Sequence, residues 1–174
     1  MDNTDRKILD LLQHDATLSI AEIGDRVGLS QTPCWKRIQR LEADGVIERR
    51  VAILNPEKLD LPLIVFVSIE TSDHSEGWLS HFAAVVSEMP EVLELYRMAG
   101  EVDYMLRVVV SGMPAYDAFY KRLIAAVRLK NVTSHFAMER VKATTALPIP
   151  IKPAGSPLAR PAGKPPMRAS GTVL

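Results

Sequence analysis

The sequence predicts an α+β protein in which a helix-turn-helix domain of winged-helix type precedes a ferredoxin-like βαββαβ domain. Capped amphipathic helices fill residues 1–45, and strand and helix patterns alternate over residues 63–141. The dipeptide Asn55-Pro56 breaks the pattern between the two regions. We therefore expect domains at residues 1–60 and 61–147, followed by a disordered Pro-rich tail at residues 148–174.

The composition, 47% hydrophobic and 24% charged, is typical of a globular protein. Charges occur throughout the N-terminal segment MDNTDRKILDLLQHD, and no stretch approaches the roughly 20 apolar residues of a membrane span. We expect a cytoplasmic protein without a membrane partner. The single cysteine, Cys34, excludes an internal disulfide, and His14, His74, His81 and His135 lack metal-ligand spacing, so neither a metal nor a cofactor is expected.

Three helices are predicted in the N-terminal region. Residues 4–14 place leucine and isoleucine side chains on one stripe, which indicates an amphipathic helix. Ser19 and Glu22 have the spacing of a capping box at the start of a second helix, and Gly28 can end that helix in a left-handed conformation. A third helix over residues 30–44 has Ser30 at its cap position.

The third helix has two different faces. Cys34, Ile38 and Leu41 recur at helical spacing and are expected in the core. The opposite side carries hydrogen-bond donors and cations, namely Trp35, Lys36, Gln39 and Arg40. Residues 46–55, VIERRVAILN, then predict a short strand pair or wing.

Two helices joined by a tight turn, the second with a basic outer face, have the geometry that inserts a helix into the major groove of DNA. An ordinary three-helix bundle with a solvated charged face fits the same periodicity. Net charge does not separate these alternatives, because residues 1–60 hold 9 Lys/Arg against 11 Asp/Glu. Within residues 30–41, however, Lys36, Arg37 and Arg40 occur without an acid, which favours a local positive face.

Residues 27–47, VGLSQTPCWKRIQRLEADGVI, resemble the recognition-helix region of the Lrp/AsnC (feast/famine) transcription regulators. LNPEKLDLPLIVFVSI and the GEVDY of residues 100–104 resemble the linker and the G-x-x-D-Y hairpin of the same family, so the resemblance covers residues 2–147. It implies a regulator that binds double-stranded DNA and responds to an amino acid. TPCWKRIQRLE, YRMAGEVDYMLRVVV and VTSHFAMERVKATT are most similar to the cysteine-responsive branch, which favours cysteine as the effector.

The outward face and the resemblance together predict the DNA-contacting residues. Base edges or sugars are expected near Gln31, Thr32, Trp35 and Gln39, and phosphates near Lys36, Arg37 and Arg40. The full expected set is Ser30, Gln31, Thr32, Pro33, Trp35, Lys36, Arg37, Gln39 and Arg40.

The second domain alternates strand and helix. Strand patterns cover residues 63–70, 92–98, 104–110 and 132–141, and helical stripes cover residues 75–88 and 114–127. The βαββαβ order puts both helices on one face of an antiparallel sheet and leaves the other face open. A period-two count places Ile64, Phe66, Met105 and Val109 on that open face, so we expect a homodimer through it. A register slip of one residue would instead turn these side chains under the helices. The family resemblance implies that dimers join into tetramers or octamers.

An effector site is expected at the turn before residue 104. Gly100 lets backbone groups approach a free amino acid closely, and Asp103 offers an acceptor for its ammonium group. Both residues also suit an ordinary turn. The resemblance implies that effector-response positions cluster at this hairpin and on the last strand, which gives Met98, Ala99, Gly100, Asp103, His135, Phe136 and Ala137.

Other functions fit the sequence less well. An enzyme of ferredoxin-like fold would need a catalytic spacing or a phosphate loop that the sequence lacks, and RNA binding by the sheet would need exposed aromatics that YMLRVVV does not offer. A winged-helix regulator without an effector remains the alternative. In the tail, Lys152, Arg160, Lys164 and Arg168 are expected to be solvated, with loose phosphate contacts as the other interpretation.

Overall fold

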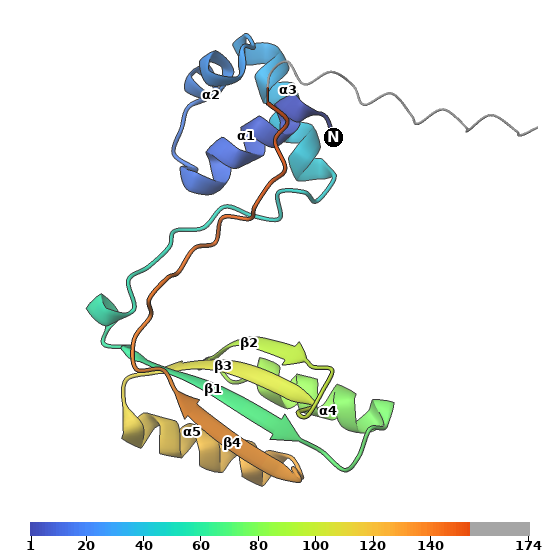
Figure 1. Ribbon diagram of the computed structural model, residues 1–174, viewed down its shortest axis with the longest axis vertical. Helices are drawn as coiled ribbons and strands as arrows, with labels where there is room; N and C mark the ends of the chain where they lie inside the picture. Colours follow the sequence, from blue (N-terminus) through green and yellow to red (C-terminus); the bar gives the residue numbers. More distant parts are fainter. Residues whose placement is uncertain (154–174) are drawn as a thin grey trace, which may run out of the picture. The chain divides into compact units, whose positions relative to one another are not determined.

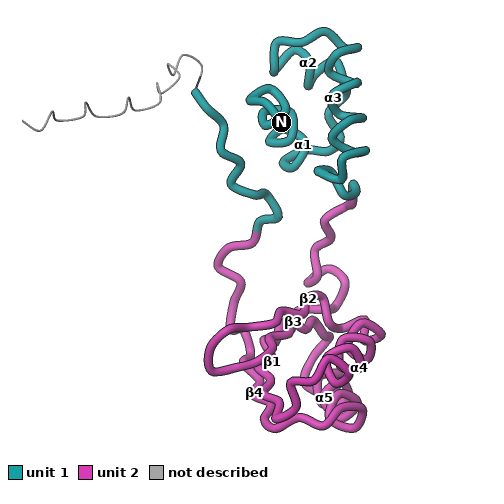
Figure 2. Tube along the Cα trace, turned by 90° about the vertical axis from the view of Figure 1, so that its right-hand side faces the viewer, with its two compact units in different colours: residues 1–50, 144–174 teal, residues 51–143 magenta. Residues whose placement is uncertain are grey.

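The computed structural model describes residues 1–153 and divides the chain into two compact units. Residues 1–50 form a helical unit together with the segment that begins at Thr144, and Val51–Ala143 form a sheet unit (Figure 2). This grouping differs from the division expected at residues 60 and 147. It assigns residues 51–60 to the sheet unit, and it makes the helical unit from two separate parts of the chain.

The helical unit contains α1 (Asn3–His14), α2 (Ile20–Val27) and α3 (Gln31–Ala43) (Figure 1). The predicted capping box of α2 is confirmed, because Ser19 accepts from the Glu22 amide and Glu22 accepts from the Ser19 amide. Gly28 follows in the left-handed conformation at φ 75° and turns the chain toward α3. Ser30 occupies the cap position of α3 but makes no side-chain cap hydrogen bond.

The core of the helical unit is small and draws on all three helices. It consists of the buried side chains Ile8, Ile23, Cys34, Ile38 and Leu41. The stripe predicted for the third helix is therefore confirmed. This packing fixes which side of α3 faces outward.

The predicted wing does not form in the described chain. Residues 46–55 contain no strand, and Val46, Val51 and Ile53 are exposed. β-branched residues favour a strand only where a partner strand and a packing surface are present, and this segment has neither within residues 1–153. A short 3-10 helix, Glu57–Leu59, then leads to the sheet.

The sheet unit has the predicted βαββαβ order. Its elements are β1 (Leu63–Glu70), α4 (Glu76–Ser87), β2 (Val92–Arg97), β3 (Tyr104–Val110), α5 (Met113–Ala126) and β4 (Asn131–Phe136). The strands are antiparallel in the order β2-β3-β1-β4, and both helices lie on one side of them (Figures 1 and 2). β4 ends at Phe136, opposite Val65 of β1, rather than at the expected residue 141, and one further hydrogen bond joins the Ala137 amide to the Ile64 carbonyl.

The side of the sheet beneath α4 and α5 holds the larger core. Val65, Val67 and Ile69 of β1 meet Phe82 from α4 and Phe119 from α5. Aromatic rings reinforce this packing: Trp78 stacks on Phe82 with ring centroids 4.9 Å apart, and Tyr104 lies 5.1 Å from Phe82. The alternation along β1 therefore decides which face is covered and which is open.

A strap, which we define as residues 144–152, runs against α1. The Gln13 side chain donates to the Leu147 carbonyl and accepts from its amide, and the Asn3 side chain pairs in the same way with the Lys152 backbone. Arg6 donates to the Pro150 carbonyl. The expectation of a disordered tail from residue 148 is therefore wrong for residues 148–152, because side chains of α1 satisfy their backbone groups. The remainder of that expectation, with Arg160, Lys164 and Arg168, lies outside the described residues.

Among residues 1–153, no helix is long and apolar enough to cross a membrane. The same part of the chain contains no cluster of His, Cys, Asp and Glu side chains that could hold a metal ion.

Candidate DNA interface and sensor site

The outward face of α3 is exposed as predicted. Gln31, Thr32, Pro33, Trp35, Lys36, Gln39 and Arg40 are all exposed, as is Ser30 at the cap. Trp35 keeps half of its surface, 50%, open to solvent. Burial raises the pKa of the Cys34 thiol on the opposite side, so Cys34 is a core residue and not a reactive thiol.

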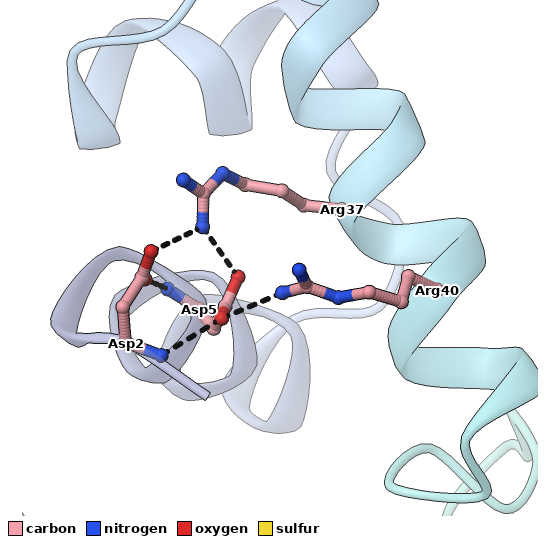
Figure 3. A network of polar contacts seen from close by, with 4 residues as sticks. All are labelled: Asp2, Asp5, Arg37 and Arg40. Atoms are coloured by element: carbon pink, nitrogen blue, oxygen red, sulfur yellow. Dashed lines mark hydrogen bonds and ion pairs between the residues drawn. The ribbon is translucent and has the colours of Figure 1, made fainter.

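Two arginines of α3 turn toward α1 (Figure 3). Arg37 donates to Asp2 Oδ2 and Asp5 Oδ1, both at 2.7 Å, and Arg40 donates to Asp5 Oδ2 at 2.7 Å. Asp5 is almost fully buried, with 1% of its side chain exposed, whereas the Arg40 side chain keeps 52%. This acidic pair neutralises much of the positive face that the sequence of α3 alone indicates.

This geometry changes the expectation for Arg37. Its side chain is 28% exposed and its guanidinium bridges two carboxylates, so the structure favours a role in holding α1 against α3 over a phosphate contact. Arg40 is half exposed and, among the residues that the structure describes, pairs with Asp5 alone, which leaves donors for a phosphate. Lys36 is exposed and takes part in none of the ion pairs found within residues 1–153.

The hairpin between β2 and β3 holds Asp103 in a defined position. The Met98 amide donates to the Asp103 carbonyl, and the Asp103 amide donates to the Ile69 carbonyl. Asp103 Oδ2 accepts from the Thr71 amide at 2.8 Å, and Oδ1 lies 3.9 Å from His74 Nδ1. Gly100 has φ 137°, a conformation that side chains rarely adopt. Asp103 thus ties the end of β1 to the hairpin with one carboxylate oxygen, and 32% of its side chain remains exposed.

The structure does not bring the predicted effector residues into one pocket of a single chain. Asp103 lies beside Ile69, at one end of β1, whereas His135, Phe136 and Ala137 lie beside residues 64–66, at the other end. The separation along the strand is about 10–15 Å at ~3.3 Å per residue.

The strand residues of the predicted site also point in different directions. His135 is opposite Phe66 on the open face, whereas Phe136 packs edge-on against Tyr116 on the helix side. Period-two counting predicts this alternation, which the grouping by resemblance did not take into account. Met98, Ala99 and Gly100 at the other end are exposed.

The residues predicted for the open face do lie on it. Ile64 pairs with Val109, Phe66 with Arg107, and Ser68 with Met105, whereas the intervening residues belong to the covered core. Phe66 is 40% exposed, Ile64 and Met105 are partly exposed, and Val109 keeps only 9%. Arg107 pairs with Glu94 at 2.6 Å on this surface. The open face therefore combines an apolar strip with an internally neutralised ion pair.

Comparison with known proteins assigns both units. Residues 1–42 match the AsnC-type helix-turn-helix domain, and residues 64–147 match the Lrp/AsnC ligand binding domain. The DNA-binding transcriptional activator DecR of Escherichia coli is 55% identical over 150 residues, which are 86% of this chain and 99% of the relative. The chain belongs to the Lrp/AsnC family. It is a transcription regulator that binds DNA and responds to an amino acid, and it is not an enzyme.

Other Lrp/AsnC relatives support the same assignment. The glutamate uptake regulatory protein of Zymomonas mobilis is 49% identical over 86% of this chain and 92% of its own length. Among solved structures, an AsnC family transcriptional regulator from Agrobacterium tumefaciens has a TM-score of 0.83 and 59% identity, with coverage of 85% and 97%. A Neisseria meningitidis transcriptional regulator in complex with L-Met has a TM-score of 0.81 and 34% identity, with coverage of 85% and 96%.

Sequence reasoning missed three structural features of this Lrp/AsnC chain. Asp2 and Asp5 are the acids that pair with Arg37 and Arg40 of α3, and no local sequence pattern predicts this pairing. Gly24 is buried, and a Cβ there would lie 2.6 Å from the Leu29 carbonyl oxygen, so a larger residue would force the backbone to shift. The Gln13 contact with the strap joins positions 134 residues apart. Only the second of these features had a local signal in the sequence. A glycine inside a short amphipathic helix, here Gly24 in α2, indicates that another backbone segment comes close to it.

Proposed function

We propose that cysteine is the effector of this Lrp/AsnC regulator and that it binds beside the hairpin of Gly100 and Asp103. The observation that carries the proposal is the geometry of the Asp103 carboxylate, which has one oxygen bound to the Thr71 amide and the other 3.9 Å from His74 Nδ1, with 32% of the side chain exposed. A free amino acid needs an acceptor for its ammonium group, and Asp103 Oδ1 supplies a charged one. The similarity of three segments to the cysteine-responsive branch supports cysteine over other amino acids.

A second copy of the chain completes the proposed site. An amino acid of the size of cysteine is too short to reach from Asp103 to the far end of the same β1, where His135 and Ala137 lie. The hairpin of one copy and the β4 end of another can meet at one ligand. The ligand then changes the stability of the contact between copies, because it binds the assembled state in preference to the separated one.

Dimers form through the open face of the sheet, and dimers join into tetramers or octamers. Ile64, Phe66 and Met105 supply the apolar strip, and pairing of Arg107 with Glu94 removes the cost of bringing like charges together. Each dimer presents two copies of α3 to DNA in the cytoplasm. Gln31, Thr32, Trp35 and Gln39 lie nearest base edges, and Lys36 and Arg40 lie on phosphates.

Calorimetry on the full chain tests the effector. Asp103→Asn keeps an oxygen for the Thr71 amide but removes the negative charge, so cysteine affinity is expected to fall about tenfold or more. Glu101→Gln, an exposed charge removal in the same hairpin, is the matched control and should bind cysteine as the wild type does. DNA affinity without cysteine should remain unchanged in both variants.

Three outcomes would contradict the proposal in different ways. Wild-type cysteine affinity in Asp103→Asn would place the ligand elsewhere. Tighter binding of another amino acid would retain the site and replace the effector. Absence of binding by every amino acid would favour a regulator without an effector.

A further inference from the structure

A shallow hollow lies where the first turns of α2 and α3 meet. It encloses about 260 Å³ and is lined by Ile20, Gln31, Thr32 and Trp35. Ile20 is the first residue of α2 and packs partly against the helical core, whereas Trp35 is half exposed. The exposed Trp35 beside Ile20 therefore forms an apolar surface that does not contribute to the core of the helical unit.

The surroundings of the hollow point to a nucleic-acid ligand. Gln31 and Thr32 are exposed polar groups at its rim, and the exposed Lys36 follows Trp35 in the chain. A helix-turn-helix places the N-terminal turn of its second helix against base edges in the major groove. On those edges the C5 methyl of thymine is the one apolar group, and the other groups are hydrogen-bond donors and acceptors.

We propose that this hollow binds the C5 methyl group of an operator thymine, with Trp35 and Ile20 as the apolar contact. The assignment rests on the proposed function, because α3 must contact DNA for the hollow to meet a base. It adds a source of sequence preference that hydrogen bonding by Gln31 and Gln39 does not provide. Phosphate neutralisation alone would need Lys36 and Arg40 and would leave the apolar floor without a role.

Replacing thymine by uracil tests the contact, because uracil lacks only the methyl group. DNA fragments are selected from a random pool with the full wild-type chain and resynthesised with deoxyuridine at each thymine in turn. At one or more positions the replacement is expected to weaken binding about fourfold, the effect of losing one buried methyl group.

Two variants complete a thermodynamic cycle with these DNAs. Trp35→Ala removes most of the apolar floor and should bind thymine and uracil fragments with equal affinity. Lys36→Ala is the matched control from the next position of α3. It should weaken binding to both fragments alike and retain the fourfold ratio. A thermal unfolding midpoint equal to that of the wild type verifies that each variant is folded.

Equal affinity of the wild type for thymine and uracil at every position would overturn the proposal and leave DNA binding by α3 intact. A fourfold ratio that persists in Trp35→Ala would also overturn it, because the methyl group would then lie outside the hollow. Failure to select any fragment would instead contradict the proposed DNA interface itself.

Discussion

Asp5 is nearly fully buried between α1 and α3 and accepts hydrogen bonds from two arginines of α3. Burial alone would raise the pKa of its carboxyl group, but hydrogen bonds from the Asp2 amide and the Arg37 guanidinium outweigh burial and lower the pKa. The sequence predicted which face of α3 is polar but not which distant acid meets it. Helical periodicity gives the direction of a side chain and contains no information on a partner more than 30 residues away.

Asp5→Asn is expected to destabilise the helical unit by about 1–3 kcal/mol, because it weakens two charge-assisted hydrogen bonds in a buried place. Urea unfolding monitored by circular dichroism measures the change. Asp25→Asn removes an exposed carboxylate of the same unit and should leave the free energy of unfolding nearly unchanged. Equal effects of the two substitutions would contradict a structural role for Asp5.

The same carboxylates make the helical unit sensitive to acid. The Asp5 amide and the Arg37 guanidinium lower the pKa of Asp2 from 3.8 to about 2, and the Asp5 pKa is lowered as well. A lowered pKa in the folded state adds stability that is complete above the unfolded value of 3.8. This stability should be lost as the pH falls from about 4 toward 2, and thermal melts across that window should show a flatter pH dependence in Asp2→Asn.

At the scale of the element, the sequence predicted the helices and strands wherever periodicity and caps agree. Ser19 with Glu22 and Gly28 located both ends of α2 correctly. The wing over residues 46–55 was wrong, because strand formation depends on a partner that local sequence does not reveal. The candidate effector site was predicted in part. The position of Asp103 at the hairpin follows from local turn chemistry, but the far end of β4 is fixed only by pairing across the sheet.

Gly24→Ala should destabilise the turn between α2 and α3 by about 1–3 kcal/mol, because the new Cβ would overlap the Leu29 carbonyl oxygen. Gly77→Ala in α4 is the matched control with the opposite sign. No atom lies within 4 Å of a Cβ there, so a small gain is expected from the better helix former, below the roughly 0.5–1 kcal/mol of a helix interior because Gly77 lies in the first turn of α4. If Gly24→Ala and Gly77→Ala changed the free energy of unfolding in the same direction, the close contact between Gly24 and the Leu29 carbonyl would not explain the need for glycine.

At the scale of the whole molecule, both units expose surfaces that the described residues of the chain leave uncovered. The open face of the sheet displays Phe66 between strands whose other side is fully packed. The first unit displays α3. What binds to each of these two surfaces does not follow from secondary structure, because a sequence pattern shows that a face is apolar but not what covers it.

Phe66→Arg is expected to convert the assembly into monomers, because a charge at the centre of the open face would be buried without a partner. Sedimentation at micromolar concentration measures the change. Ile124→Arg, at a similarly exposed apolar residue of α5, should leave the assembly intact. A wild-type protein that sediments as a monomer would contradict the dimer itself.

Removal of the strap should loosen α1, whereas a shorter truncation should not. Deletion from Thr144 onward removes the hydrogen bonds of Asn3, Arg6 and Gln13 with the strap and should destabilise the helical unit by about 1–3 kcal/mol. Deletion of residues 154–174 alone retains them. Hydrogen exchange of α1 peptides distinguishes the two variants, and equal exchange would show that the strap does not stabilise α1.

The strap also determines when the helical unit is complete during synthesis. The ribosome releases α1, α2 and α3 early, but residues 144–152 emerge only after the entire sheet unit. At ~5–20 residues per second, the 134 residues that separate Gln13 from Leu147 take about 7–27 s to synthesise, so α1 waits that long for the segment that binds it. The nascent chain therefore displays a helical unit without its strap until the entire sheet unit has been made, and a fragment expressed as residues 1–60 would lack the strap permanently.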